Sequence, residues 1–251
     1  MSFRRTRLFW VLALRLSRIS ETRNSFPRFG MANRSNAKSH CRSFTKRQAF
    51  EAYVKTATSL TKKQLVRRPF FQRDPLTCAR ELIGTELIWG DCSGIVVEVE
   101  AYAAIDDEAA HTFTRPSARS FIERNKAGAA YVYFNYGVHW MLNVLVKGEA
   151  NGFVLFRAIE PRRGVELMKR RRGVEDLRQL CSGPGKLTQA LDITDRHHEM
   201  DLCGDPLHCF VSDAEATFDI VADNRVGISR SAHLPWRFTL RGSPFVSRAP
   251  R

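Results

Sequence analysis

The clearest pattern along this chain is a series of short apolar runs that are rich in β-branched and aromatic residues. The run SGIVVEVE at residues 93–100 shows a partial alternation of apolar and polar positions, which is typical of a β-strand. Further strands are predicted at residues 131–134, 138–146 and 153–159, and shorter ones at 207–212, 218–221 and 236–240.

Helical spacing is confined to a few segments. Leu76, Ala79 and Leu82 give residues 75–84 a helical period that stops at Gly84, and residues 166–172 and 185–191 are the clearest later helices. Most strands follow one another without a long helix between them. The pattern therefore predicts a mixed α/β (α+β) fold around a largely antiparallel sheet with flanking helices, and not a doubly wound sheet.

Charge divides the chain into two parts. The formal net charge is +14, but residues 1–72 hold 17 Lys or Arg against two acids, Glu21 and Glu51, which leaves 23 Lys or Arg and 24 acids in the remainder. We therefore expect residues 1–72 to be a basic, disordered N-terminal tail and residues 73–248 to form the single domain. Any affinity of that domain for nucleic acid must come from local basic patches.

The N-terminal residues leave the compartment open. The apolar run LFWVLAL at residues 8–14 is too short to span a bilayer and ends at Arg15, so no membrane partner is expected. The abundance of Arg and Ser resembles a transit peptide, whereas Met31 is an alternative start. We favour an intracellular, DNA-associated protein of a bacterial cytoplasm, or of an organelle or nucleus if the N-terminus is a targeting segment.

Cysteine and histidine spacing argues against a metal site. The six cysteines form no CxxC pair and are expected to be reduced thiols (Cys41, Cys78, Cys92, Cys181, Cys203, Cys209). Zinc near Cys203 and Cys209 is an alternative, because His197, His198 and His208 lie close in sequence. No second ligand pair has workable spacing, so we expect no metal and no organic cofactor.

Candidate chemistry gathers in residues 97–192. This stretch contains VEVEAY, DDEAAHT, YVYFNYGVHWMLN, LFRAIEP and LCSGPGKLTQALDI, beginning at Val97, Asp106, Tyr131, Leu155 and Leu180. Aromatic side chains can grip a flat heterocycle, and one carboxylate can activate water. The combination indicates a pocket for a nucleobase that has been flipped out of a duplex.

These motifs, in their order and spacing, resemble the alkyladenine (3-methyladenine) DNA glycosylase family. The resemblance runs from Asp74 to Ser247 and includes the C-terminal RVGISR…PWRF…GSPFVS. It implies one domain around a curved, largely antiparallel sheet. The string SGPGKLTQAL is faintly similar to helix-hairpin-helix glycosylases, but Pro184 and Gln189 depart from that motif and no helical array precedes it. We therefore do not expect a helix-hairpin-helix fold.

The resemblance implies two catalytic residues. Glu100 matches the family's general base, and Arg157 matches the arginine near the catalytic water and the target's backbone. A single carboxylate suffices because an alkylated purine is already cationic and leaves readily, whereas cleavage between two sugars needs a second, protonated carboxyl group. For Arg157, an ion pair with Glu160 at a strand end is the alternative. Glu98 shares a strand face with Glu100 because side chains alternate with a period of two.

The base pocket is implied in the same way. Tyr102, His111 and Tyr133 match positions that stack on or hydrogen-bond to the flipped base, and electron-rich tyrosine faces favour a cationic ring. Asn143 matches the amide that excludes guanine. We expect Tyr131 to be a core residue, because Tyr131, Tyr133 and the turn after Phe134 cannot all face one site.

Two further features are expected to contact the duplex. Tyr136, beside Gly137, matches the wedge that fills the gap left by the flipped nucleotide, although Val138 and His139 differ from residues found next to it in some relatives. Small residues at the start of a helix leave N–H groups free for a phosphate. We therefore assign contacts with the DNA backbone to Ser182, Gly183, Gly185 and Lys186.

The function predicted from sequence is excision of alkylated purines, 3-methyladenine among them, from double-stranded DNA by a monomer, leaving an abasic site. Lys126 and Lys147 lie nearest to the motifs and are expected in loops, so a monofunctional hydrolase that uses water is favoured over a lyase with an amine nucleophile. The alternatives are a non-catalytic protein that binds damaged nucleic acid and a protein that binds RNA through its tail. The presence of Glu100, His111 and Arg157 argues against the first alternative. The second would have no need for the arrangement of residues 100–102 and 133–143.

Overall fold

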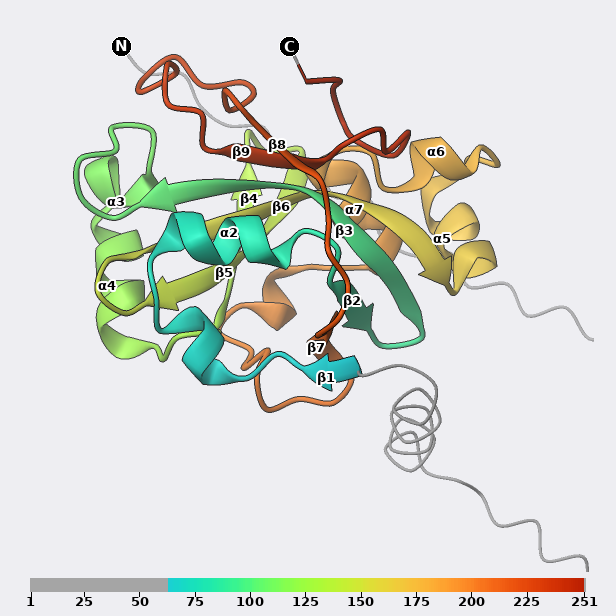
Figure 1. Ribbon diagram of the computed structural model, residues 1–251, viewed down its shortest axis with the longest axis horizontal. Helices are drawn as coiled ribbons and strands as arrows, with labels where there is room; N and C mark the ends of the chain where they lie inside the picture. The colour runs from blue at the N-terminus through green and yellow to red at the C-terminus, as the bar shows by residue number, and fades with distance from the viewer. Residues whose placement is uncertain (1–62, 251) are drawn as a thin grey trace, which may run out of the picture. The chain divides into compact units, whose positions relative to one another are not determined.

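A computed structural model describes residues 63–250 (Figure 1), so the predictions for residues 1–62 lie outside the described residues. Its first strand, Lys63–Leu65, pairs with residues 211–213, and a short 3-10 helix follows at Arg68–Phe71. Regular structure is therefore present N-terminal of the boundary predicted at residue 72.

The strands predicted from the apolar runs are present, each within four residues of the expected bounds. The nine strands are β1 (Lys63–Leu65), β2 (Glu86–Trp89), β3 (Cys92–Ala103), β4 (Ala130–Asn135), β5 (His139–Lys147), β6 (Asn151–Arg163), β7 (His208–Asp213), β8 (Ile220–Asp223) and β9 (Arg237–Leu240). The helices are α2 (Pro75–Leu82), α3 (His111–Thr114), α4 (Pro116–Arg124), α5 (Val165–Arg172), α6 (Leu177–Leu180) and α7 (Pro184–Leu191), with a second 3-10 helix at Asp195–His197.

All strand pairs of the described residues are antiparallel, and they form one open sheet. The order along its main path is β1-β7-β2-β3-β6-β5-β4. The sheet branches at β3, because the edge opposite β6 pairs with β2 over its first part and with β9 over residues 98–100. The predicted mixed α/β fold with a largely antiparallel sheet is thus confirmed.

Side-chain alternation gives β5 and β6 two different faces. Leu142, Val144, Val154 and Phe156 belong to the main hydrophobic core, which also contains side chains of α2 and α7. Their neighbours in sequence point the other way. On that second face, Leu145 and Phe153 pack against α4, and the remaining space forms a cavity.

Local sequence explains the ends of α2. Asp74 accepts hydrogen bonds from the backbone N–H groups of Leu76 and Thr77, which caps the helix N-terminus, and Pro75 occupies its first position. Gly84 follows with a φ of 86°. A β-carbon there would meet the ring of Phe218, so both the backbone and the packing require glycine.

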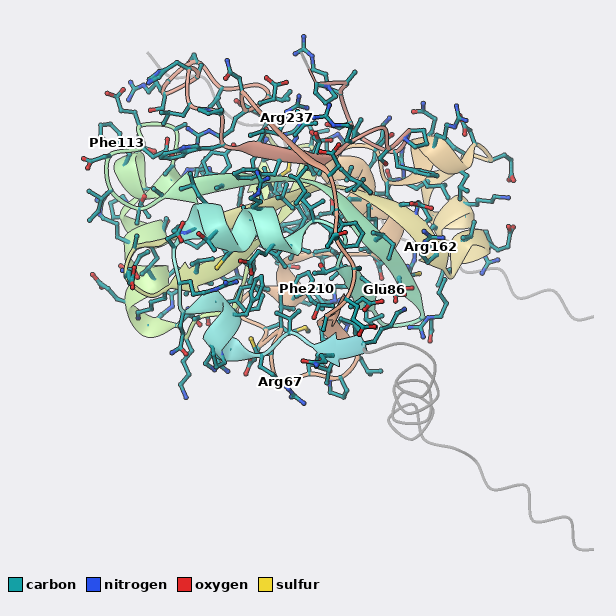
Figure 2. All side chains as sticks on the ribbon, in the orientation of Figure 1. Arg67, Glu86, Phe113, Arg162, Phe210 and Arg237 are labelled. Atoms are coloured by element: carbon teal, nitrogen blue, oxygen red, sulfur yellow. The ribbon has the colours of Figure 1, made fainter. Side chains whose placement is uncertain are left out.

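Figure 2 shows Phe210 in the interior, Arg237 on β9, and Phe113 and Arg162 near opposite ends of the long strands. Phe210 stacks on Phe156 with ring centroids 5.1 Å apart, which joins β7 to β6 across the main core. Within residues 63–250, no helix is both long and apolar enough to cross a bilayer.

Candidate active site

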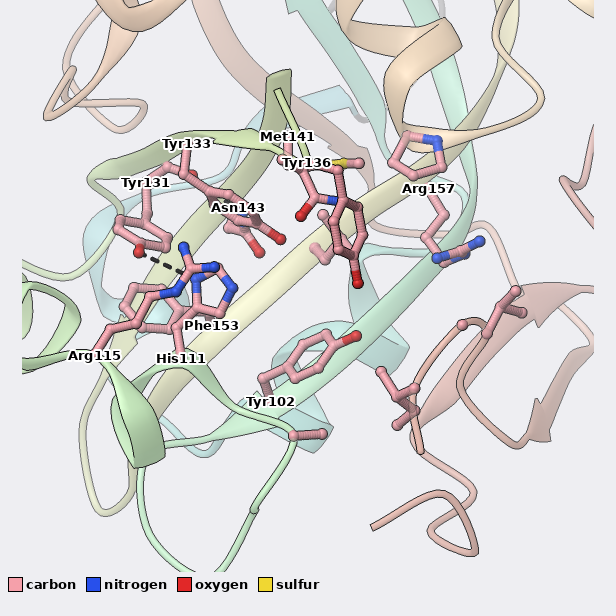
Figure 3. Close-up of a pocket in the computed structure, with 17 residues that line it drawn as sticks. Tyr102, His111, Arg115, Tyr131, Tyr133, Tyr136, Met141, Asn143, Phe153 and Arg157 are labelled. Atoms are coloured by element: carbon pink, nitrogen blue, oxygen red, sulfur yellow. Dashed lines mark hydrogen bonds between the residues drawn. The ribbon is translucent and has the colours of Figure 1, made fainter. Parts of the chain in front are cut away.

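A cavity of about 290 Å³ opens on the second face of the sheet, between β4–β6, α3 and the chain that follows β8 (Figure 3). Its lining is mainly aromatic and polar. The lining residues are Tyr102, Ala109, His111, Arg115, Tyr131, Tyr133, Asn135, Tyr136, Met141, Asn143, Phe153, Leu155, Arg157, Pro184, Val226, Gly227 and Ile228. Every residue assigned to the base pocket from the sequence is among them, and so are Arg157 and Tyr136.

Glu100 lies behind the cavity wall on β3. Its side chain is buried, and its three hydrogen-bond partners all line the cavity. Oε1 accepts from the backbone N–H of Val226 at 2.6 Å, while Oε2 accepts from the Tyr102 hydroxyl at 2.9 Å and from Nη1 of Arg157 at 3.3 Å. An ionised carboxylate has about four acceptor sites. Donors of the described residues use three of these sites.

Arg157 connects Glu100 to Glu98. Its Nε donates to Oε1 of Glu98 at 3.0 Å, on the strand face that Glu98 shares with Glu100. Burial lowers the pKa of Arg157, but the carboxylates of Glu100 and Glu98 raise it by more, so the net shift is upward. The alternative pairing of Arg157 with Glu160 is wrong, because Glu160 forms an ion pair with Arg162 instead.

Glu98 is fully buried and is held from the C-terminal part of the chain. Nη1 of Arg237 donates to Oε1 at 3.1 Å, and the Ser247 hydroxyl donates to the same atom at 2.8 Å. The Ser247 backbone N–H donates to Oε2 at 2.5 Å. Nη2 of Arg157 also donates to the Ser247 hydroxyl at 3.3 Å. The segment GSPFVS therefore closes over the back of the two carboxylates.

His111 and Tyr133 form one wall of the cavity. Their rings meet edge to face, with centroids 4.3 Å apart, and Nδ1 of His111 lies 3.2 Å from the Tyr131 hydroxyl. Burial and the neighbouring Arg115 guanidinium lower the pKa of His111 to about 4. Burial raises the pKa of Tyr133 to about 12. Both side chains are consequently uncharged at neutral pH.

Tyr131 lines the cavity as well, which corrects the expectation from sequence. Tyr131 and Tyr133 lie two residues apart on β4 and so share a face, while the hairpin brings Tyr136 over the same opening. Part of the prediction holds, because Tyr131 also packs against Phe121 and Phe153 with centroids 4.9 and 4.6 Å away. Its backbone carbonyl accepts from Nδ2 of Asn143 at 3.1 Å, which orients that amide.

Tyr136 is at the tip of the β4–β5 hairpin and is 90% exposed. The backbone N–H of Val138 bonds to the carbonyl of Asn135 at 3.0 Å, and the two residues between them have positive φ angles, 50° for Tyr136 and 68° for Gly137. A two-residue turn of this type favours Asn or Gly, and an aromatic residue costs about 1–3 kcal/mol there. Strain at an exposed aromatic tip indicates that the ring has a function outside the folded domain.

A buried ion pair behind Tyr102 was not predicted from the sequence. Both side chains of Asp107 and Arg225 are 0% exposed, and Arg225 donates to the two carboxylate oxygens at 2.6 and 2.8 Å. The guanidinium carbon lies 4.5 Å from the Tyr102 ring centroid and 5.1 Å from that of Trp236. The pair therefore holds Tyr102 from the side away from the cavity. The sequence pointed to Arg225 only through the RVGISR motif that contains it.

The residues assigned to the DNA backbone lie at the start of α7, beside the cavity residue Pro184. Nζ of Lys186 contacts Gln179 at 2.8 Å and Ser182 at 3.5 Å. Gly183 is the N-cap, with no side chain capping the helix. Gly185 is buried against His139, where a β-carbon would come within 2.6 Å of the ring. Close packing below the Tyr136 hairpin thus explains this glycine, and a phosphate contact stays a prediction.

Within residues 63–250, no group of three or more His, Cys, Asp or Glu side chains is placed to hold a metal ion. The five cysteines of this range are free thiols, all buried except the partly exposed Cys203. Lys147, expected in a loop, is the last residue of β5, and its Nζ donates to the carbonyl of Ile122 at 2.7 Å.

Comparisons with known proteins identify the family of the chain. The model of the methylpurine-DNA glycosylase family matches residues 69–244. A relative from Rhodopseudomonas palustris (strain BisB18) is 48% identical over 187 residues, which cover 73% of this chain and 90% of the relative. A relative from Agrobacterium fabrum is 47% identical over 73% of this chain and 92% of the relative. A relative from Nitrosospira multiformis is 40% identical over 71% of this chain and 91% of the relative. All three bear the name "Putative 3-methyladenine DNA glycosylase".

Proposed function

Because the chain belongs to the methylpurine-DNA glycosylase family, we propose that it flips alkylated purines, 3-methyladenine among them, out of duplex DNA and hydrolyses their N-glycosidic bonds. Membership of the family makes it a DNA glycosylase, a hydrolase that acts on N-glycosidic bonds in DNA repair. Its partner is double-stranded DNA, on which it acts as a monomer inside the cell, and the product is an abasic site.

One observation carries the catalytic part of the proposal. A buried carboxylate, Glu100, is fixed by three donors at the wall of a cavity lined by four tyrosines. Tyr102, Arg157 and Val226 each contact both Glu100 and the cavity, so a water bound at the fourth acceptor site of the carboxylate would face the sugar of a flipped nucleotide.

Glu100 accepts a proton from this water while the water oxygen bonds to the anomeric carbon of the sugar. The bond from that carbon to the purine breaks, and its electron pair leaves with the base. Base assistance of this kind is worth about 10²–10⁴-fold. Arg157 orients the carboxylate through Nη1, and Glu98 fixes Arg157 through Nε, at 3.3 and 3.0 Å.

The base binds between Tyr102 on β3 and the wall formed by His111 and Tyr133. Asn143, held in one orientation by the Tyr131 carbonyl, stands at the inner side of the cavity and disfavours guanine, whose exocyclic amine distinguishes it from adenine. A pocket that rejects an abundant normal base reduces unwanted excision from undamaged DNA.

Tyr136 fills the gap that the flipped nucleotide leaves in the stack. Flipping costs a few kcal/mol, and stacking of an aromatic ring on a base returns about 1–3 kcal/mol. Ser182, Gly183, Gly185 and Lys186 hold the adjacent phosphates through N–H groups and the charge of Lys186.

The experiment uses a duplex with one 3-methyladenine and the full-length protein. We expect release of free 3-methyladenine and an abasic site that alkali cleaves, with no release from the same duplex carrying adenine. Tight binding to the lesion duplex without release of the base would contradict the hydrolase and favour a non-catalytic protein that binds damaged DNA.

A further inference from the structure

The part of the cavity assigned to the base is almost free of charge. Tyr102, Tyr133 and Asn143 are uncharged at neutral pH, and so is His111, since burial and the adjacent Arg115 lower its pKa to about 4. Arg115, the N-cap residue of α4, is the exception. It lines the cavity, and Figure 3 shows its guanidinium beside His111 and close to Tyr131.

Arg115 differs from the other arginines of the site. Arg157 and Arg225 each form ion pairs with buried carboxylates. No ion pair of Arg115 is found within residues 63–250. Its positive charge is therefore not cancelled by a contacting carboxylate. The guanidinium carbon lies 5.7 Å from the ring centroid of Tyr133.

Both tyrosines assigned to base stacking already contact a guanidinium. Arg115 lies over Tyr133, and Arg225 lies 4.5 Å from the centroid of Tyr102 without lining the cavity, so it occupies the far face of that ring. The attraction of a ring for a cation comes from its negative face. A cationic base on the opposite face of Tyr102 is therefore attracted less strongly. Both rings favour a cationic base over a neutral one less than tyrosines without a neighbouring guanidinium would.

We propose that Arg115 is a specificity-determining residue that shifts the preference of the pocket from cationic lesion bases towards neutral ones that offer hydrogen-bond acceptors. This inference rests on the proposed glycosylase function and narrows its substrate class.

The change in charge of the base during bond cleavage explains how Arg115 can shift this preference. When the glycosidic bond breaks, its electron pair moves onto the base, so a neutral purine leaves as an anion and a cationic purine leaves neutral. Arg115 favours this movement of negative charge in both cases. A cationic base, however, is repelled by Arg115 when it enters the pocket. The second-order rate constant compares the transition state with free protein and free DNA. By this comparison the charge of Arg115 accelerates release of a neutral base. For a cationic base, the repulsion on entry and the stabilisation during bond cleavage cancel.

The test compares second-order excision constants, measured with limiting protein, for duplexes that carry one hypoxanthine (neutral) or one 7-methylguanine (cationic). Arg115→Gln should lower the hypoxanthine constant and leave the 7-methylguanine constant unchanged or higher, so that their ratio falls on the order of tenfold. This is the effect of one charge about 10 Å from the base at an effective dielectric constant of 20. Arg115→Lys keeps the charge and should keep most of the ratio.

The matched control is Arg124→Gln at the other end of α4. Arg124 pairs with Glu199 on the surface and does not line the cavity, so this variant should retain the wild-type ratio. Equal losses for both bases in Arg115→Gln, or an unchanged ratio, would overturn the proposal, and so would a wild type that releases 7-methylguanine but no hypoxanthine. A wild type that releases neither of these bases nor 3-methyladenine contradicts the glycosylase function itself.

Discussion

Nη1 of Arg157 on β6 lies 3.3 Å from Oε2 of Glu100 on the neighbouring strand β3. The same guanidinium reaches Glu98 through Nε at 3.0 Å, so one buried arginine holds two carboxylates in fixed positions. Burial of an unpaired carboxylate is costly, and this shared ion pair offsets the removal of Glu100 from bulk solvent. The position of the proposed general base thus depends on the pairing of two long strands.

The buried pair of Asp107 and Arg225 should be essential for stability. Asp107→Asn leaves the Arg225 charge buried without a carboxylate, and we expect the free energy of unfolding to fall by about 3–5 kcal/mol. Urea denaturation of wild type and variant measures the change. Asp106→Asn is the matched control, because Asp106 is exposed. A loss below about 1 kcal/mol in Asp107→Asn would show that the pair is not needed.

Tyr136 should oppose stability and support activity. Its φ of 50° suits glycine, and its 90% exposed ring makes little packing contribution. Tyr136→Gly should therefore raise the free energy of unfolding by about 1 kcal/mol and slow excision at least tenfold, while Tyr136→Phe keeps the excision rate. A Tyr136→Gly protein that is less stable, or equally active, would contradict this interpretation of the turn.

The neutral His111 should make stability depend on pH. Its pKa is lowered from 6.5 to about 4 in the folded protein. A depressed pKa gives stability that is present above pH 6.5 and is lost as pH falls towards 4. The stability difference between wild type and His111→Asn should consequently shrink between pH 7 and pH 4.5, because the variant lacks this group. Denaturation of both proteins at pH 7 and pH 4.5 measures this difference in stability. An equal difference at the two pH values would contradict the lowered pKa of His111.

The N-terminal residues should contribute affinity that depends on salt. Residues 1–62 hold 14 Lys or Arg and two Glu. Their removal should flatten the plot of log affinity for undamaged duplex against log salt, by about 0.9 for each phosphate that they neutralise, and should leave the single-turnover excision rate unchanged. The truncation ends before Lys63 because β1 pairs with β7. Equal slopes for the two proteins would exclude this role.

Repeating local patterns made most of the fold predictable. The runs around Val97, Tyr133 and Leu155 marked the central strands, and the same motifs named most of the cavity residues. β2 (ELIW) was missed because all four of its residues are buried and show no alternation. α3 and α4 were missed because the sequence HTFTRPSARS carries no clear apolar stripe and contains Pro116.

Contacts between residues distant in sequence could not be predicted. Arg225 and Asp107 are 118 positions apart, and Ser247 and Glu98 are 149 apart, so no local spacing indicates either pair. Arg115 was missed for a different reason. An arginine before a proline resembles a surface residue, and only the packing of α3 and α4 against β4 turns it towards the cavity.

The most direct test of the central claim is single-turnover excision of 3-methyladenine by wild type and Glu100→Gln. Glutamine keeps the size of the side chain but cannot accept a proton from water. We predict that both proteins bind the lesion duplex with similar affinity and that the variant releases the base about 10²–10⁴-fold more slowly. Equal rates of release would contradict the assignment of Glu100 as the general base and direct the search to Glu98, Asp106 and Asp107.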